Sequence, residues 1–181
     1  MLWLPSRTDA SERECSCGFA IWQPLAATRL CTVGFYDDWR FPGRLIVSLN
    51  RHFESVEEVP GRVLSRFVIE TQAISKVQRA ALAADRVNIA ILGNQEVHVH
   101  AHLVPRLYAE EPAPGKAPWE DPRPRGRLDA SRASVLRNRL TQALAEQGRT
   151  GRPRLTPVIV DESEHAERAS SAVPEDRLVV T

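Results

Sequence analysis

Three histidines at alternating positions are the residues of this sequence whose type and spacing point most directly to chemistry. His98, His100 and His102 are separated by single apolar residues. On a β-strand they would share one face and lie about 7 Å apart, too far for direct hydrogen bonds but suited to one extended substrate. Histidine titrates near neutral pH and can act as nucleophile or acid. Because only His52 and His165 occur elsewhere, the cluster favours a catalytic site over a polar strand face.

The strand that carries these histidines is predicted over residues 97–105. It follows a strand over residues 86–92, with a turn at Gly93-Asn94 between them. Short apolar runs rich in β-forming residues predict further strands at residues 17–22, 29–35 and 44–50. Gln23-Pro24 is interpreted as the turn between the first two of these strands.

Two amphipathic helices complete the expected elements. Apolar residues spaced by three and four follow Pro60 as far as Ala81, and proline fits the first turn of a helix because its missing N–H is not needed there. Asp129 or Ser131 can cap a second helix that ends near Gly148.

Composition predicts one soluble domain. The chain has 181 residues, of which 43% are hydrophobic and 26% charged, as in an ordinary globular protein. Residues 15–148 are expected to form the domain, residues 1–14 a flexible leader and residues 149–181 a mostly disordered tail, because the tail has no sustained apolar period.

Charge and hydropathy exclude several classes of partner. The formal net charge of +1 argues against a nucleic-acid coat protein. No signal-like start is present, and no run approaches the roughly 20 apolar residues that span a membrane. The sequence therefore predicts a cytoplasmic protein without nucleic-acid or membrane partners. Three cysteines in such a compartment favour metal ligation or simple burial over a disulfide framework.

The triad and its flanks resemble the histidine-triad (HIT) family. His98-Val-His100-Ala-His102-Leu-Val fits the family signature of histidines alternating with hydrophobic residues. The flanking segments look like those of a bacterial branch described as diadenosine-tetraphosphate-hydrolase-like, and these segments are Pro42–Val47, Asn50–His52, Asn88, Leu92–Asn94, Pro105-Arg106 and Gly115–Trp119. The resemblance covers residues 15–119.

The resemblance implies a fold, an assembly and an activity. The expected fold is α+β and HIT-like, with an antiparallel sheet of about five strands and two packed helices, and relatives usually form homodimers. The implied activity is hydrolysis or transfer at the α-phosphate of a nucleotide substrate, either a dinucleoside polyphosphate or a nucleoside phosphoramidate. No cofactor is required for this chemistry.

The resemblance also implies a role for each histidine. His100 is the nucleophile and forms a nucleotidyl-phosphohistidine intermediate that water hydrolyses, which splits one difficult displacement into two easier ones. His102 would donate to oxygens of the α-phosphate, and His98 would orient the strand or serve a metal.

Four further residues are substrate-binding candidates by the same resemblance. Asn94 would contact the phosphate or the leaving group, and Asn88 would lie near the active site. Asp37 and Asp38 follow the strand that supplies an acid to the ribose hydroxyls in the family. A solvated loop pair that caps a turn is the alternative interpretation of these two aspartates.

A structural zinc site is a further expectation. Many relatives bind zinc through an N-terminal Cys-x-x-Cys pair, a histidine at the place of His52 and the first triad histidine. Here the pair is Cys15-Ser-Cys17, one residue short, whereas His52 and His98 are in place. Because structural zinc takes four ligands in a tetrahedron, the alternative for one cysteine is simple burial.

Two other functions remain open from the sequence. Alternate histidines on a strand can bind a catalytic zinc whose bound water attacks the substrate, which would make the protein a metallohydrolase. A noncatalytic nucleotide-binding module could use the same pocket. An intact triad disfavours that second alternative, since a binding protein needs no nucleophile.

Overall fold

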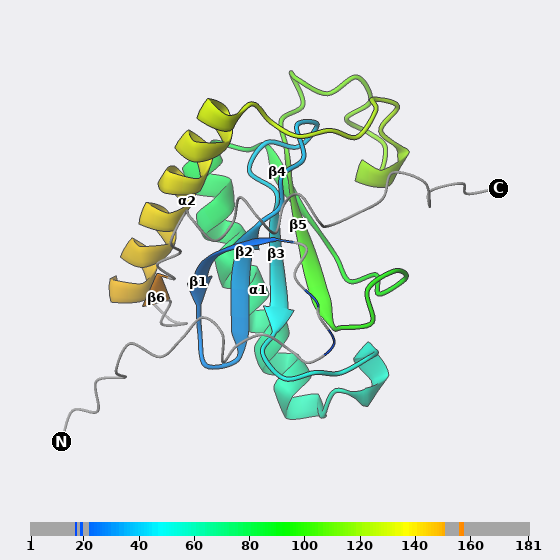
Figure 1. The fold of residues 1–181 in the computed structure, drawn as a ribbon, viewed down its shortest axis with the longest axis vertical. Helices are drawn as coiled ribbons and strands as arrows, with labels where there is room; N and C mark the ends of the chain where they lie inside the picture. The colour runs from blue at the N-terminus through cyan, green and yellow to red at the C-terminus, as the bar shows by residue number, and fades with distance from the viewer. Residues whose placement is uncertain (1–16, 18, 20–21, 151–155, 158–181) are drawn as a thin grey trace.

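The structure is an open antiparallel sheet with two long helices packed on one face (Figure 1). The computed structural model describes residues 17, 19, 22–150 and 156–157. Within these residues, five strands and a two-residue sixth lie in the order β4-β5-β3-β2-β1-β6. The elements are β1 (Gln23–Ala27), β2 (Cys31–Phe35), β3 (Leu45–Leu49), α1 (Gly61–Leu82), β4 (Arg86–Ala90), β5 (His100–Arg106), α2 (Ala130–Thr150) and β6 (Thr156–Pro157). The expected α+β class is confirmed.

The hydrophobic core fills the space between the sheet and the helices. Alternate residues of β2, β3 and β5, among them Val33, Val47 and Leu103, face Phe67 of α1 and Leu140 of α2 in one buried cluster. The intervening residues of the same strands face away from the helices because side chains alternate along a strand. The triad histidines lie on that second face.

The first strand does not lie where the sequence predicted it. The described residues between positions 17 and 22 are not in a strand, and β1 instead includes Gln23-Pro24, which was expected to form a turn. Pro24 is accommodated because the β1–β2 register shifts between Pro24 and Ala26, and a bulge tolerates a residue without an N–H. The turn lies instead at residues 28–30, where the Thr28 hydroxyl accepts the N–H groups of Leu30 and Cys31.

Helix α1 is held to the sheet by a buried glutamine. Gln78 is fully buried, and its amide nitrogen donates to the carbonyls of Gly43, at 2.8 Å, and Leu103, at 3.1 Å. The Gly43 carbonyl lies just before β3, and the Leu103 carbonyl lies in the middle of β5. Gln78 therefore fixes the helix against the two strands that carry the site.

Helix α2 begins where the sequence placed it. The Asp129 carboxylate accepts the N–H of Arg132 at 2.8 Å, as an N-cap does. The helix continues to Thr150, and β6 pairs Thr156 and Pro157 with Ala27 and Ala26 of β1. These residues of the expected tail thus have regular structure, whereas the leader (1–14) and residues 151–155 and 158–181 lie outside the described residues. None of the described helices is long and apolar enough to cross a membrane.

Candidate active site

The triad histidines lie on the face of the sheet opposite the helices. β5 begins at His100, and its His100 and His102 pair in register with Ser48 and Ile46 of β3. His98 precedes the strand instead of lying within it, because Val99 bonds to the Phe53 carbonyl and the Leu49 N–H outside the regular ladder. His98 and His100 are nevertheless only 2% and 3% exposed. Burial on this face removes them from bulk water.

A chain of hydrogen bonds fixes the protonation of each ring in this cluster. Arg44 lies 3.0 Å from His102 Nδ1 through its Nη2, and since a guanidinium can only donate, His102 Nδ1 must accept. The proton of neutral His102 is then on Nε2, which lies 3.2 Å from His100 Nε2. His100 in turn donates from Nδ1 to the His98 carbonyl at 2.6 Å. His100 Nε2 therefore carries a lone pair, as a nucleophile requires.

The close approach of His100 and His102 corrects the sequence-based expectation. The flat-strand spacing of about 7 Å predicted no direct hydrogen bond between neighbours, but the ring centroids are 4.8 Å apart, with the ring planes at 84°. Side chains on one face can rotate toward each other about their own bonds, and Arg44 holds His102 from its other nitrogen. The two rings therefore act as a pair.

Burial and the arginine keep the imidazoles neutral. Burial lowers the pKa of His102 to about 3, with the positive charge of Arg44 and the neighbouring His100 acting in the same direction. Burial also lowers the pKa of His100, opposed in part by its hydrogen bond to the His98 carbonyl. At neutral pH both rings are therefore uncharged, consistent with the direction of every hydrogen bond in the chain.

Arg44 is itself positioned by a buried aspartate. Asp38 is 3% exposed; it accepts two hydrogen bonds from the side chain of Arg40 and one from Arg44 Nη1 at 3.0 Å. Burial would raise the pKa of Asp38, but the hydrogen bonds and charges of the arginines outweigh it and hold the pKa below its usual range. The ring of Tyr36 lies 4.3 Å from the Arg44 guanidinium. Arg44 is thereby aimed at His102.

His98 belongs to a second cluster. Its Nε2 lies 2.7 Å from the Leu49 carbonyl, which can only accept, so the ring proton is on Nε2 and Nδ1 has the lone pair. That Nδ1 lies 3.4 Å from Cys17 Sγ and 3.4 Å from His52 Nδ1. Ligand atoms of Cys17, His52 and His98 all lie within 4.8 Å of one another. Cys15 lies outside the described residues, and Cys31 is buried in the core.

Two contacts of this second cluster fit a tetrahedral metal. Zinc bonds of about 2.0–2.1 Å to nitrogen and 2.3 Å to sulfur place neighbouring ligand atoms about 3.3–3.6 Å apart in a tetrahedron. The two contacts of 3.4 Å lie in that range. The hydrogen bond of His98 to a backbone carbonyl is the usual way a ligand histidine is oriented.

The remaining substrate-binding candidates lie apart from the triad or are engaged in the fold. Asn94 is exposed in the loop between β4 and β5. Asn88 accepts a hydrogen bond from Arg106 at 2.7 Å. Asp37 accepts the Leu128 N–H at 2.8 Å, and Asp38 is committed to Arg40 and Arg44. Asp38 is thus buried and not solvated, although its carboxylate caps the turn as the alternative expected, by accepting the Arg40 N–H at 3.2 Å. A ribose contact of either aspartate stays a prediction.

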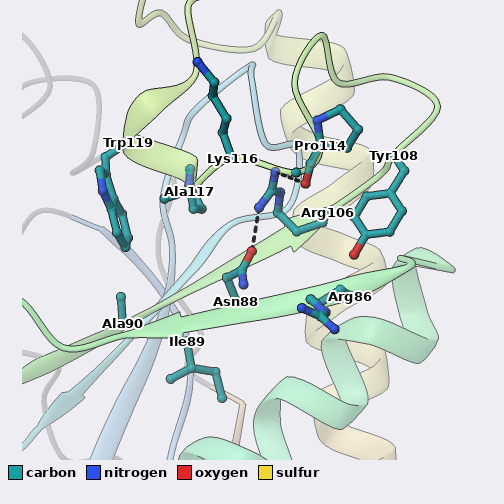
Figure 2. A pocket seen from close by; sticks show the side chains of 12 residues that line it. Arg86, Asn88, Ile89, Ala90, Arg106, Tyr108, Pro114, Lys116, Ala117 and Trp119 are labelled. Carbon is teal, nitrogen blue, oxygen red and sulfur yellow. Dashed lines mark hydrogen bonds between the residues drawn. The ribbon is translucent and has the colours of Figure 1, made fainter.

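A cavity of about 340 Å³ opens beside the triad (Figure 2). Its floor is the open face of β4 and β5, and its roof is the loop that includes Pro114–Trp119. Ala90 lines the cavity and pairs in register with His102. The cavity therefore adjoins the histidine cluster.

Sequence reasoning missed two contributors to the site. Arg44 was noted only as part of a flanking segment, and nothing in its residue type reveals that it bonds to His102. Phe19 packs against both His98 and His100, with ring centroids 4.9 Å and 4.7 Å away. An aromatic residue beside a glycine near a chain end gives no signal of such a contact.

Comparison with known proteins identifies the fold. No protein-family model and no curated protein matches the sequence. A histidine triad protein from Marinobacter aquaeolei VT8 has a similar structure, with a TM-score of 0.61 and 22% identity over 70% of this chain and 90% of its own. The chain has the histidine-triad fold. A histidine triad protein from Sinorhizobium meliloti 1021 gives a TM-score of 0.60 at 21% identity, over 68% of this chain and 90% of its own.

A third neighbour with the histidine-triad fold is described as Zn-bound. This family protein from Mycobacterium smegmatis gives a TM-score of 0.50 at 21% identity, over 69% of this chain and 88% of its own. At such identities the similarity establishes the fold and not the activity.

Proposed function

We propose that this chain is a HIT-family nucleotide hydrolase or transferase in which His100 attacks the α-phosphate of its substrate. The observation that carries the proposal is the hydrogen-bond chain from Arg44 through His102 and His100 to the His98 carbonyl, which leaves the lone pair on His100 Nε2. Structural neighbours that are histidine triad proteins support the family assignment.

The reaction follows from these protonation states. His100 Nε2 forms a bond to the α-phosphorus while the bond from phosphorus to the leaving group breaks, and the leaving group takes the electron pair. His102 Nε2–H, which faces His100 in the resting site, is the donor available to an oxygen of the phosphate. Water then attacks phosphorus and loses a proton to solvent, the N–P bond breaks with its electron pair returning to His100 Nε2, and the nucleotide is released.

The decisive experiment replaces the nucleophile. His100→Asn should lower turnover by several orders of magnitude, while nucleotide binding survives because the pocket depends on many residues. Quenching the wild type during turnover of a substrate labelled in the adenylyl group should trap acid-labile label on the peptide that contains His100. Near wild-type turnover in the variant, or label on another residue, would contradict the proposal. Binding with no turnover of any adenylyl substrate would favour the noncatalytic module.

The orientation of the imidazole lone pairs of the triad disfavours the metallohydrolase alternative. A catalytic zinc held by the triad needs all three histidines to present lone pairs to one point. The lone pair of His98 instead faces Cys17 and His52, and the Nδ1 proton of His100 is bonded to backbone. Activity that a chelator abolishes and zinc restores, in a protein lacking Cys17, would revive this alternative.

We also propose that Cys17, His52 and His98 hold a structural zinc, with Cys15 as the candidate fourth ligand. The distances between ligand atoms, the orientation of His98 and the Zn-bound neighbour support it. Zinc supplies folding energy at such a site.

Homodimerisation is a further proposal. Among the strands of the described residues, β4 is an outer strand and pairs only with β5. Ile89, Ile91 and Leu92, on this strand and just after it, are exposed. Unpaired edges and apolar residues of this kind favour association with another chain. Sedimentation should show twice the chain mass.

A further inference from the structure

A second cavity, of about 470 Å³, lies between the β1–β2 turn and the first turns of α1. Its lining residues come from the turn and from the helix, and they are Arg29, Leu30, Arg62, Val63, Arg66 and Glu70. The turn and the start of α1 lie at the same end of the sheet (Figure 1). Because α1 packs on the face opposite the triad, the sheet separates this cavity from the histidines.

A buried glutamate fixes the two walls of this cavity to each other. Glu70 of α1 is 3% exposed, and its Oε2 accepts the Thr28 hydroxyl at 2.8 Å. The same hydroxyl oxygen accepts the Leu30 N–H within the turn. Glu70 Oε1 accepts the Nε–H of Arg66 at 2.9 Å. Both oxygens of the carboxylate are therefore bonded within the protein, and the cavity is already formed without a ligand.

The charge of Glu70 balances one of the three arginines in the lining and leaves two. Arg66 is the arginine that pairs with Glu70. None of the ion pairs among the described residues involves Arg29 or Arg62. Three arginines and one glutamate give the lining a net charge of +2. A concave site with such an excess concentrates positive potential and attracts an anion.

The position of Arg62 works against the stability of the helix. Arg62 is the second residue of α1, and the N–H groups at a helix start already have a partial positive charge. The first turn contains no acidic residue, and no side chain caps it. Arg66 is a second cation four residues further on, where like charges repel. A residue that lowers local stability without an ion pair to offset the cost is expected at a functional site.

We propose that this cavity binds a small phosphate monoester that has an apolar group. The phosphate of such a compound has nearly two negative charges at neutral pH, which match the net charge of the lining, and arginine side chains bind phosphate oxygens through paired N–H donors. The apolar group packs on Leu30 and Val63, which are half-buried against the core. The volume lies in the range of small-ligand sites. This binding site does not depend on the function proposed for His100.

The test uses phenyl phosphate, with inorganic phosphate as the same anion without the apolar group. Titration of the full chain followed by amide NMR measures each affinity at the cavity itself, through the signals of Leu30 and Val63. Phenyl phosphate should bind the wild type about tenfold more tightly than inorganic phosphate, because its ring is removed from water. Arg29→Ala and Arg62→Ala should each weaken the binding of both compounds by about tenfold. Val63→Thr should reduce only the advantage of phenyl phosphate. Arg139→Ala, at an exposed position on α2, is the matched control and should keep the wild-type affinities.

A charge reversal separates a binding role of Arg62 from a structural one. Arg62→Glu places an acidic residue at the start of α1, so the melting temperature should rise by about one to three degrees while phenyl phosphate no longer binds at the cavity. A lower melting temperature in this variant would show that Arg62 stabilises the fold and would overturn the argument for a ligand. His100→Asn should leave the affinity at the cavity unchanged, whatever its effect on turnover. If neither compound shifts the Leu30 and Val63 signals, or if both alanine variants bind as the wild type does, the cavity is not an anion site.

Discussion

The depressed pKa of His102 should make the folded protein sensitive to mild acid. Its pKa is about 3 in the folded state, against about 6.5 for an unperturbed histidine in the unfolded chain. Between these values the unfolded state binds a proton that the folded state does not, so the stabilisation is complete above pH 6.5 and falls as the pH drops toward 3. From pH 7 to pH 5 this residue alone should remove about 2 kcal/mol from the free energy of unfolding.

The matched variant is His102→Gln. The glutamine oxygen can accept from Arg44 and its amide can donate to His100, so the two contacts of the ring are imitated without a titrating group. Urea unfolding of both proteins at pH 7 and pH 5, with chelator present in every sample, isolates His102 from the Cys17–His52–His98 cluster. The variant should lose about 2 kcal/mol less than the wild type between the two pH values. Equal losses in the free energy of unfolding of the two proteins would show that His102 is protonated in the folded state as readily as in the unfolded chain. Arg44 would then not keep His102 neutral.

Three further predictions concern Arg44, the proposed metal site and the pairing of β6 with β1. Arg44→Met removes the donor to His102 and one partner of Asp38. In this variant kcat/KM should fall by about tenfold to a hundredfold and the pKa of His102 should rise, whereas Arg44→Lys should recover part of the loss. An unchanged rate in Arg44→Met would show that Arg44 does not contribute to the site. Cys17→Ser should lower both the zinc content, measured by elemental analysis, and the melting temperature, and stoichiometric zinc in this variant would exclude Cys17 as a ligand. A chain ending at Thr150 lacks the pairing of β6 with β1, so its melting temperature should be a few degrees lower. A chain ending at Pro157 should have the melting temperature of the full protein. The same melting temperature for all three proteins would mean that β6 adds no stability.

The elements near the triad could be predicted because their signals are local. Alternation of histidines with apolar residues predicted the strand that carries His100 and His102, although His98 precedes it, and spacings of three and four predicted α1. The N-cap at Asp129 depends only on its side chain and on the N–H groups of the next three residues. Such signals need no knowledge of what the segment packs against.

The misplaced first strand shows where local signals fail. Pro24 and its neighbour Gln23 have the residue types of a turn, and only the bulge in the β1–β2 pairing lets Pro24 stay in the sheet. The bulge lies in the pairing of β1 with β2, and β1 also pairs with β6 from the other end of the domain. Residue propensities within a short window contain no information on those partners.

The role of Arg44 was unpredictable for a related reason. It contacts a histidine 58 positions away, and the contact exists because β3 pairs with β5 in a register that sets Leu45 opposite Leu103. A shift of one residue would turn the neighbouring side chains to the other face of the sheet. The sequence thus located the cluster of histidines, but not the arginine that determines their protonation.

His98 joins the two clusters of the site and decides how a metal could influence the reaction. Its ring faces Cys17 and His52, while its backbone carbonyl accepts the Nδ1 proton of His100. A zinc bound by the ring would therefore hold that carbonyl in place, and with it the protonation state of the nucleophile, without contacting the substrate.

Removal of the metal by a chelator should lower kcat in part and lower the melting temperature, because the carbonyl becomes less well fixed, whereas a catalytic zinc would make the loss complete. His52→Asn, which alters the cluster but no hydrogen bond of His100, should reproduce the partial loss. If it instead abolishes turnover as fully as His100→Asn does, His52 acts on the chemical step itself and the separation of the two clusters is wrong.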